Sequence, residues 1–194
     1  MISFIRLALV LAIICCGAAL SLSKVYIVTK EPIAYQKRLR LIKAVKAVLP
    51  LKKVQANVEI TDNITCKNEM NQETCKTVFK VKEKEKIILF AYQEKVKGYG
   101  GDISLIVGVS PEKKITGVQV IHHSETPGLG ANIKKESFLS QFANLNAEDS
   151  LLELKKKGGI IDQVTGATIS SEAVILAVKQ GASFIANNLN QLYN

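Results

Sequence analysis

An uncharged apolar run near the N-terminus limits what the first part of this chain can become. The segment from Leu7 to Leu22 consists almost entirely of Leu, Ile, Val, Ala and Cys, and extending it to Val28 adds only one charge, Lys24. About 20 apolar residues in a helix span a bilayer, and a lysine near one end can reach the interface. We therefore predict a transmembrane anchor over residues 1–28. A cleaved signal peptide is the alternative, because Gly17 to Ser21 weakly resembles a cleavage site.

The rest of the 194-residue chain is long enough for one further domain. Its net charge of +9 is compatible with nucleic acid or an anionic membrane as partner. The lysines alternate with glutamates, as in Lys82–Lys86, and aromatic residues are not interleaved with them. This pattern is typical of a solvated surface, so we predict no nucleic-acid partner.

The charges that flank the apolar run do not fix its orientation. Arg6 is the only charge before the run, whereas Lys24, Lys30, Lys37 and further basic residues follow it. Read literally, the positive-inside rule would leave the domain in the cytoplasm, but long downstream domains are translocated largely regardless of charge. The side of the membrane therefore stays open at this point.

Two cysteines lie outside the apolar run. Cys66 and Cys75 occur in the polar stretch from Asn63 to Thr77, whereas Cys15 and Cys16 lie inside the run. An isolated pair favours a disulfide in an oxidising compartment, with free thiols as the alternative. The spacing matches no zinc or haem signature, so we predict no metal site there.

The periodicity of the remaining chain predicts an α+β fold with antiparallel strands and packed helices. Apolar residues at helical spacing from Leu41 to Leu49, ended by Pro50, predict a juxtamembrane helix within a connecting region, residues 29–76. A domain over residues 77–194 follows. Its predicted strands are Thr77–Val81, Lys86–Gln93, the hairpin Ile103–Val109 with Ile115–His122, and Ile160–Val164; its predicted helices are Lys135–Asn144 and Ile169–Leu192.

Three glycine-bearing loops stand out in this domain: Gly98–Gly101, Glu125–Gly130 and Thr165–Thr168. None has the glycine spacing of a dinucleotide fingerprint or a P-loop. The third loop precedes a helix, whose free N–H groups could bind a phosphate, although a plain helix cap explains the same residues. The adjacent His122 and His123 would point to opposite faces of a strand and so could not readily share a metal.

Taken together, the three loops resemble the FMN-binding domain family, in which they occur in the same order. Asp162 followed by Thr165-Gly-Ala-Thr168 resembles the family's flavinylation motif, and Glu125-Thr-Pro-Gly-Leu-Gly130 and Gly98-Tyr-Gly-Gly101 resemble its other two loops. With one N-terminal span and this short length, the chain resembles the G subunit of Rnf electron-transport complexes. That protein is related to the C subunit of the sodium-translocating NADH:quinone reductase.

The resemblance implies a site for covalent FMN. The flavin would be attached through its phosphate to the hydroxyl of Thr168, with Thr165 ranking second as acceptor, and Asp162 would serve a flavin transferase that matures the protein. Phe138 stands where relatives often have a tryptophan. The other residues implied to line the flavin are Gly98, Tyr99, Glu125, Thr126, Pro127, Gly128, Leu129, Gly166 and Ala167.

The resemblance also implies a role and a location. The chain would relay electrons in an ion-translocating ferredoxin:NAD+ oxidoreductase, as an electron-transfer subunit without catalytic side chains of its own. Its domain would lie on the periplasmic side of the inner membrane, among the other membrane subunits. The alternatives are a structural or sensory subunit without a working flavin, and the equivalent subunit of a quinone reductase.

Overall fold

The computed structural model describes residues 2–49, 57–67, 73–83 and 86–193. The chain divides into two compact units, Met1–Leu41 and Ile42–Asn194. Each unit is described by itself.

Helix α1 (Ile2–Ala47) contains the apolar run. Its large apolar side chains from Phe4 to Val28 are exposed, and the stretch is long and apolar enough to cross a membrane by length and composition. Helix α3 (Thr168–Tyr193) passes the same test of length and composition, but 61% of its apolar window is buried, which is typical of a core helix. The prediction of a separate helix from Leu41 was wrong, because α1 continues through Pro32 and ends at Ala47.

Five antiparallel strands form one sheet, in chain order. They are β1 (Asn57–Lys67), β2 (Glu73–Glu83), β3 (Lys86–Lys97), β4 (Asp102–Val109) and β5 (Ile115–His123). The predicted antiparallel hairpin β4–β5 is confirmed. Most of the polar stretch from Asn63 to Thr77, to which the sequence analysis assigned no element, belongs to β1 and β2, which pair with each other.

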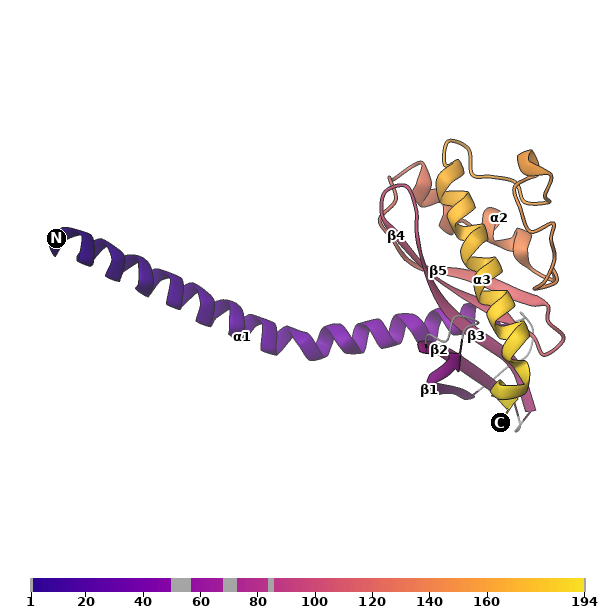
Figure 1. Cartoon of the computed structure of the whole chain (residues 1–194), viewed down its shortest axis with the longest axis horizontal. Coiled ribbons are helices and arrows are strands. Elements are labelled where there is room, and N and C mark those ends of the chain that lie inside the picture. Colours follow the sequence, from indigo (N-terminus) through magenta and orange to yellow (C-terminus); the bar gives the residue numbers. More distant parts are fainter. Residues whose placement is uncertain (1, 50–56, 68–72, 84–85, 194) are drawn as a thin grey trace. The chain divides into compact units, whose positions relative to one another are not determined.

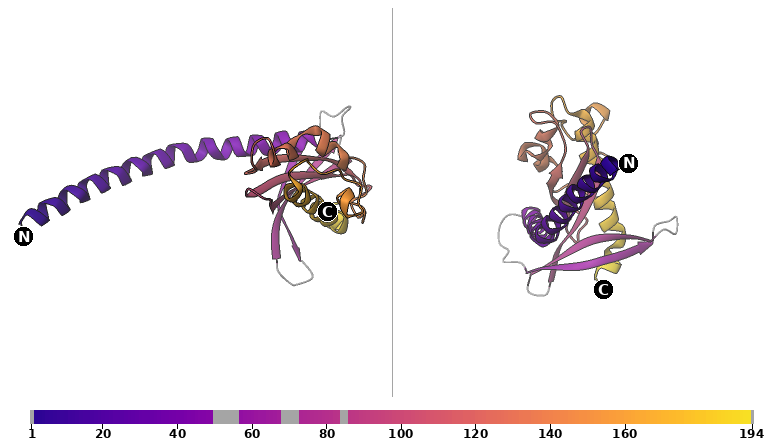
Figure 2. Two further views of the ribbon diagram at one scale, coloured as in Figure 1. Left: turned by 90° about the horizontal axis from the view of Figure 1, so that it is seen from above. Right: turned by 90° about the vertical axis from the view of Figure 1, so that its left-hand side faces the viewer.

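The two faces of the sheet are covered by different parts of the chain. On one face α3 packs against β3 and β4, as Figures 1 and 2 show. Gly181 permits this close approach, because a Cβ at that position would lie 2.9 Å from the ring of Tyr92. On the other face Val48, just after α1, packs over Gly108 and Gly117. The Thr116 hydroxyl donates a hydrogen bond of 2.9 Å to the Val48 carbonyl, which holds Val48 on the sheet.

The segment after β5 differs from the predicted continuous helix Lys135–Asn144. It consists of the 3-10 helix η1 (Gly130–Lys134), the single turn α2 (Glu136–Leu139) and the 3-10 helix η2 (Ser140–Phe142). Phe138 and Phe142 are buried edge to face, with ring centroids 5.6 Å apart. Burial of the two rings stabilises this segment more than a regular helix would. A helix here would be short, and no side chain caps the start of α2.

The predicted strand Ile160–Val164 was also wrong. Ile161 forms one isolated parallel bridge with Leu154, directly after the 3-10 turn η3 (Lys155–Lys157). Gly158 ends that turn at a φ of 90°, a conformation that suits glycine. The following predicted helix is confirmed as α3, which begins at Thr168.

The proposed disulfide falls partly outside the described structure. The backbone register pairs Cys66 with Thr74 and Cys75 with Thr65 on strands β1 and β2. The side chains of both cysteines lie outside the described part. The disulfide therefore stays a prediction.

Candidate functional site

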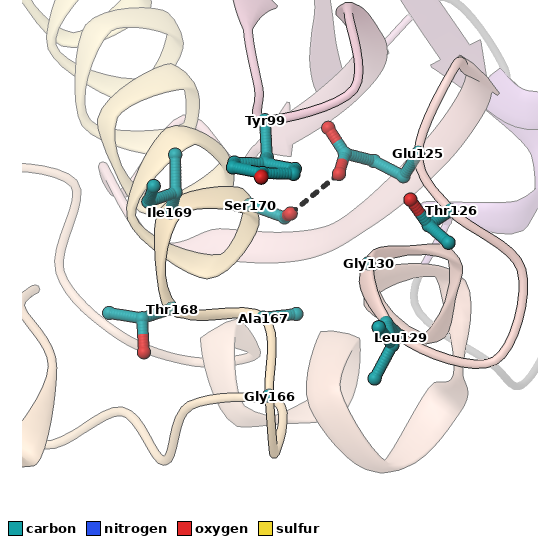
Figure 3. Close-up of a pocket in the computed structure, with 10 residues that line it drawn as sticks. All are labelled: Tyr99, Glu125, Thr126, Leu129, Gly130, Gly166, Ala167, Thr168, Ile169 and Ser170. Atoms are coloured by element: carbon teal, nitrogen blue, oxygen red, sulfur yellow. Dashed lines mark hydrogen bonds between the residues drawn. The ribbon is translucent and has the colours of Figure 1, made fainter.

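A pocket of about 330 Å³ lies where the three glycine-bearing loops meet the first turn of α3 (Figure 3). Exposed apolar side chains of Tyr99, Leu129 and Ile169 form part of its wall. The full set of lining residues is Tyr99, Glu125, Thr126, Leu129, Gly130, Gly166, Ala167, Thr168, Ile169 and Ser170. Loops separated by up to about 70 positions in the sequence therefore build one site.

The carboxylate of Glu125 links its own loop to the Gly98–Gly101 loop and to α3 by hydrogen bonds. It is only 5% exposed, and its Oε2 accepts a hydrogen bond of 2.7 Å from the Ser170 hydroxyl in α3. Its Oε1 accepts a bond of 3.2 Å from the backbone N–H of Gly100. A Cβ at Gly98 or Gly130 would collide with the two carboxylate oxygens. The glycines in these loops thus leave room for one buried carboxylate.

A tight turn presents the start of α3 to the pocket. Gly166 has a φ of 72°, and the N–H of Ala167 closes the turn onto the Val164 carbonyl at 3.0 Å. Ser171 reinforces it, since its hydroxyl accepts from the N–H of Val164 at 3.0 Å and donates to the Ala167 carbonyl at 2.9 Å. The N–H of Ser171 makes the first helical hydrogen bond, so those of Thr168 and the next two residues precede the helical ladder.

The Thr168 hydroxyl has two polar neighbours. It donates a hydrogen bond of 3.0 Å to Oε1 of Gln163 and accepts one of 3.3 Å from Nζ of Lys156. The residue is half-buried. Figure 3 shows its side chain at the edge of the pocket opposite Glu125 and Thr126, pointing away from them. The hydroxyl is therefore held at the rim of the pocket rather than on its floor.

The structure brings together seven of the twelve residues expected around the flavin, namely Tyr99, Glu125, Thr126, Leu129, Gly166, Ala167 and Thr168. Gly98 lies behind the Glu125 carboxylate. Pro127 and Gly128 are exposed on their loop outside the lining. Asp162 and Thr165 instead line a neighbouring hollow of about 300 Å³.

Asp162 is held firmly beside the pocket. Its carboxylate forms an ion pair of 2.6 Å with Lys155. Its backbone N–H donates to Oε1 of Gln141 at 2.7 Å, and its carbonyl accepts from Nε2 of the same amide at 3.3 Å. The exposed carboxylate is thus presented on a fixed piece of backbone, next to the turn that leads to Thr168.

Some site residues were not predicted from the sequence. Gly130 ends the quoted Glu125–Gly130 motif, and Ile169 and Ser170 directly follow Thr168, so all three could have been included on that ground. Lys156 and Gln163 contact Thr168 because of how the loop folds. A run of lysines in the sequence does not show which of them contacts Thr168. His123 helps to hold the backbone of the Glu125 loop, because its Nδ1 accepts a hydrogen bond of 3.3 Å from the N–H of Glu125.

The residues present fit a phosphorylated aromatic group such as FMN. The N–H groups at the start of α3 and the Lys156 ammonium favour an anion near Thr168. The aromatic ring of Tyr99 and the side chains of Leu129 and Ile169 offer apolar surface for a flat ring system. An anion site therefore adjoins an apolar pocket.

Residues 98–183 match the model of the FMN-binding domain. The chain is 35% identical to the G subunit of the proton-translocating ferredoxin:NAD(+) oxidoreductase complex of Clostridium ljungdahlii, over 88% of this chain and 85% of that protein. The chain belongs to the G-subunit family of ion-translocating oxidoreductase complexes. Another member of this family, from Aliivibrio fischeri, is 33% identical over 95% of this chain and 91% of its own.

Solved structures show the same fold. The crystal structure of Shewanella oneidensis NqrC matches with a TM-score of 0.52 and 27% identity, over 68% of this chain and 69% of that one. The C subunit of the Na(+)-translocating NADH-quinone reductase from Parabacteroides distasonis matches with a TM-score of 0.50 and 24% identity, over 57% of this chain and 61% of that one. The antiparallel sheet with its packed helices is thus shared between this chain and these two proteins.

Proposed function

We propose that this chain is a membrane-anchored flavoprotein, with FMN bonded through its phosphate to Thr168, that relays electrons in an ion-translocating ferredoxin:NAD+ oxidoreductase. One observation carries the proposal: the Thr168 hydroxyl lies at the start of α3, beside Lys156 and at the rim of an apolar pocket. The likeness to the G-subunit family over most of both chains favours this complex over a quinone reductase.

Five residues of the site have a stated physical task in this proposal. The flavin supplies the redox chemistry when bound, and the protein supplies position and electrostatics. Thr168 tethers the cofactor, which keeps it at high effective concentration beside its redox partners. Tyr99, Leu129 and Ile169 would shield a bound flavin from water, and the hydrogen bonds of Glu125 hold the loops that carry them. Thr165 remains the second hydroxyl of the motif.

Intact mass spectrometry of the full chain, purified after co-expression with a flavin transferase, tests the proposal. We expect a mass gain of one FMN less one water, together with flavin fluorescence of the denatured band. Peptide mapping should locate the gain in the segment that contains Thr168. A wild-type chain of unmodified mass under these conditions would favour the structural or sensory role instead.

The proposal places the domain on the periplasmic side, among the other membrane subunits of the complex. A disulfide between Cys66 and Cys75 is part of this proposal, because disulfides persist in oxidising compartments. In intact cells, a membrane-impermeant thiol reagent should label these cysteines only after reduction. A Cys66→Ser, Cys75→Ser variant controls for Cys15 and Cys16. Labelling that requires cell lysis would place the domain in the cytoplasm.

A further inference from the structure

The three lysines of η3, Lys155–Lys157, have different partners, although they are identical in sequence. Lys155 forms an ion pair of 2.6 Å with Asp162, and Lys157 forms one of 3.1 Å with Glu172. The Lys156 ammonium instead lies 3.3 Å from Oγ1 of Thr168. The two outer charges are thus compensated by carboxylates, whereas the middle one faces a neutral hydroxyl.

The backbone around η3 fixes this arrangement. The N–H of Lys155 donates to the Ile161 carbonyl at 2.9 Å, and that of Lys157 to the Leu154 carbonyl at 2.8 Å. Gly159 packs so tightly against the backbone of Glu153 that a Cβ would collide with it. Because the turn is held on both sides, the direction of the Lys156 side chain follows from the fold of the loop.

The hydrogen bonds around Thr168 also set the direction of its hydroxyl. An ammonium can only donate, so the Thr168 oxygen accepts from Lys156 and turns its own hydrogen toward Oε1 of Gln163. A phosphoryl group bonded to this oxygen would lie within reach of the Lys156 ammonium, which is 3.3 Å from it. Lysine binds phosphate oxygens as a mobile point charge, which suits an exposed position such as this one.

We propose that Lys156 is a positioning residue for covalent flavin attachment, binding the phosphoryl oxygens while the Thr168 oxygen bonds to phosphorus. This inference rests on the proposed function. In the step, the Thr168 oxygen forms a bond to the phosphorus of the FMN half of FAD. The pyrophosphate P–O bond breaks, AMP leaves with the electron pair, and the hydroxyl proton passes to a base of the transferase, since the Gln163 amide cannot take it.

The positive charge of Lys156 also stabilises the product of the reaction. The product is a phosphodiester that keeps one negative charge, at the rim of the pocket and close to the start of α3. An ammonium beside that charge stabilises it further, although solvent screens the pair. Because solvent weakens the finished pair, the effect of Lys156 should appear mainly in the rate of attachment.

The test measures the initial rate of flavin incorporation into the full-length apoprotein in detergent, with purified transferase, FAD and Mg²⁺. Lys156→Met should slow incorporation roughly tenfold, because one charge-assisted phosphate contact is lost. Lys157→Met is the matched control, since it removes a neighbouring exposed charge of the same turn, and its rate should stay within about twofold of wild type. Lys156→Arg keeps the positive charge and should recover most of the rate. This recovery would show that the slow rate of Lys156→Met comes from the lost charge and not from misfolding.

The outcomes separate this inference from the proposed function. Incorporation at the wild-type rate in Lys156→Met would overturn the inference and leave the flavin site intact. So would an equal loss in Lys157→Met, which would indicate general attraction of the transferase, or a failure of Lys156→Arg to recover the rate. A wild-type chain that takes up no flavin contradicts the proposed function itself.

Discussion

Replacing Thr168 by valine is expected to abolish covalent flavin attachment completely. Valine has nearly the shape of threonine but lacks the hydroxyl oxygen that would form the phosphoester. The lost side-chain hydrogen bonds, to Gln163 and from Lys156, lie at a half-buried position. We therefore expect a loss of about 1 kcal/mol or less in the free energy of unfolding. Intact mass and in-gel fluorescence after co-expression with the transferase provide the measurement.

Thr165→Val is the matched control for this result. Thr165 belongs to the same motif but is exposed and lines the neighbouring hollow rather than the main pocket. This variant should keep the full mass gain. A mass gain that persists in Thr168→Val and disappears in Thr165→Val would identify the Thr165 hydroxyl as the acceptor. A gain that persists in both single variants would exclude either residue as the unique site.

Replacing Glu125 by alanine is expected to give the largest loss of stability among site variants, about 3 kcal/mol in the free energy of unfolding. The change leaves the buried Ser170 hydroxyl without its acceptor, and the N–H of the exposed Gly100 loses its bond to the carboxylate. It also leaves a cavity between Gly98 and Gly130, whose missing side chains make room for the carboxylate. Denaturant or thermal unfolding of the full chain in detergent measures the loss.

Two further variants show whether the position of the carboxylate explains the loss. Glu125→Gln keeps the volume and one oxygen for Ser170, but its amide N–H2 would face the N–H of Gly100, so an intermediate loss of about 1–2 kcal/mol is expected. Glu148→Ala removes an exposed glutamate that pairs with Lys113 at 2.9 Å, and should cost no more than about 1 kcal/mol. An alanine at position 125 that is tolerated as well as one at 148 would contradict the role assigned to Glu125.

Several features of this protein follow from neighbouring residues and were therefore predictable. The apolar run forms a helix, the conformation in which a membrane-spanning segment satisfies its backbone hydrogen bonds internally. Helix α3 starts at Thr168 because Gly166 makes the turn before it. The hairpin β4–β5 follows from two β-rich runs joined by a short loop. The wrong predictions around Phe138 and Ile161 concern segments whose conformation depends on burial or on pairing with another segment. Burial of Phe138 breaks a helix, and Ile161 pairs with Leu154 in a bridge rather than in a strand.

The sequence by itself determined the apolar N-terminal helix, the α+β class and the three loops whose order resembles a flavin-binding family. Only the tertiary structure decided which residues meet. It brought the Glu125 carboxylate onto Ser170 and Gly100, and it turned Lys156 rather than its neighbours toward Thr168. The physical reason is the range of the forces involved. Helices and turns depend on contacts a few residues apart, whereas a buried carboxylate or a directed ammonium depends on where the whole fold places its partners.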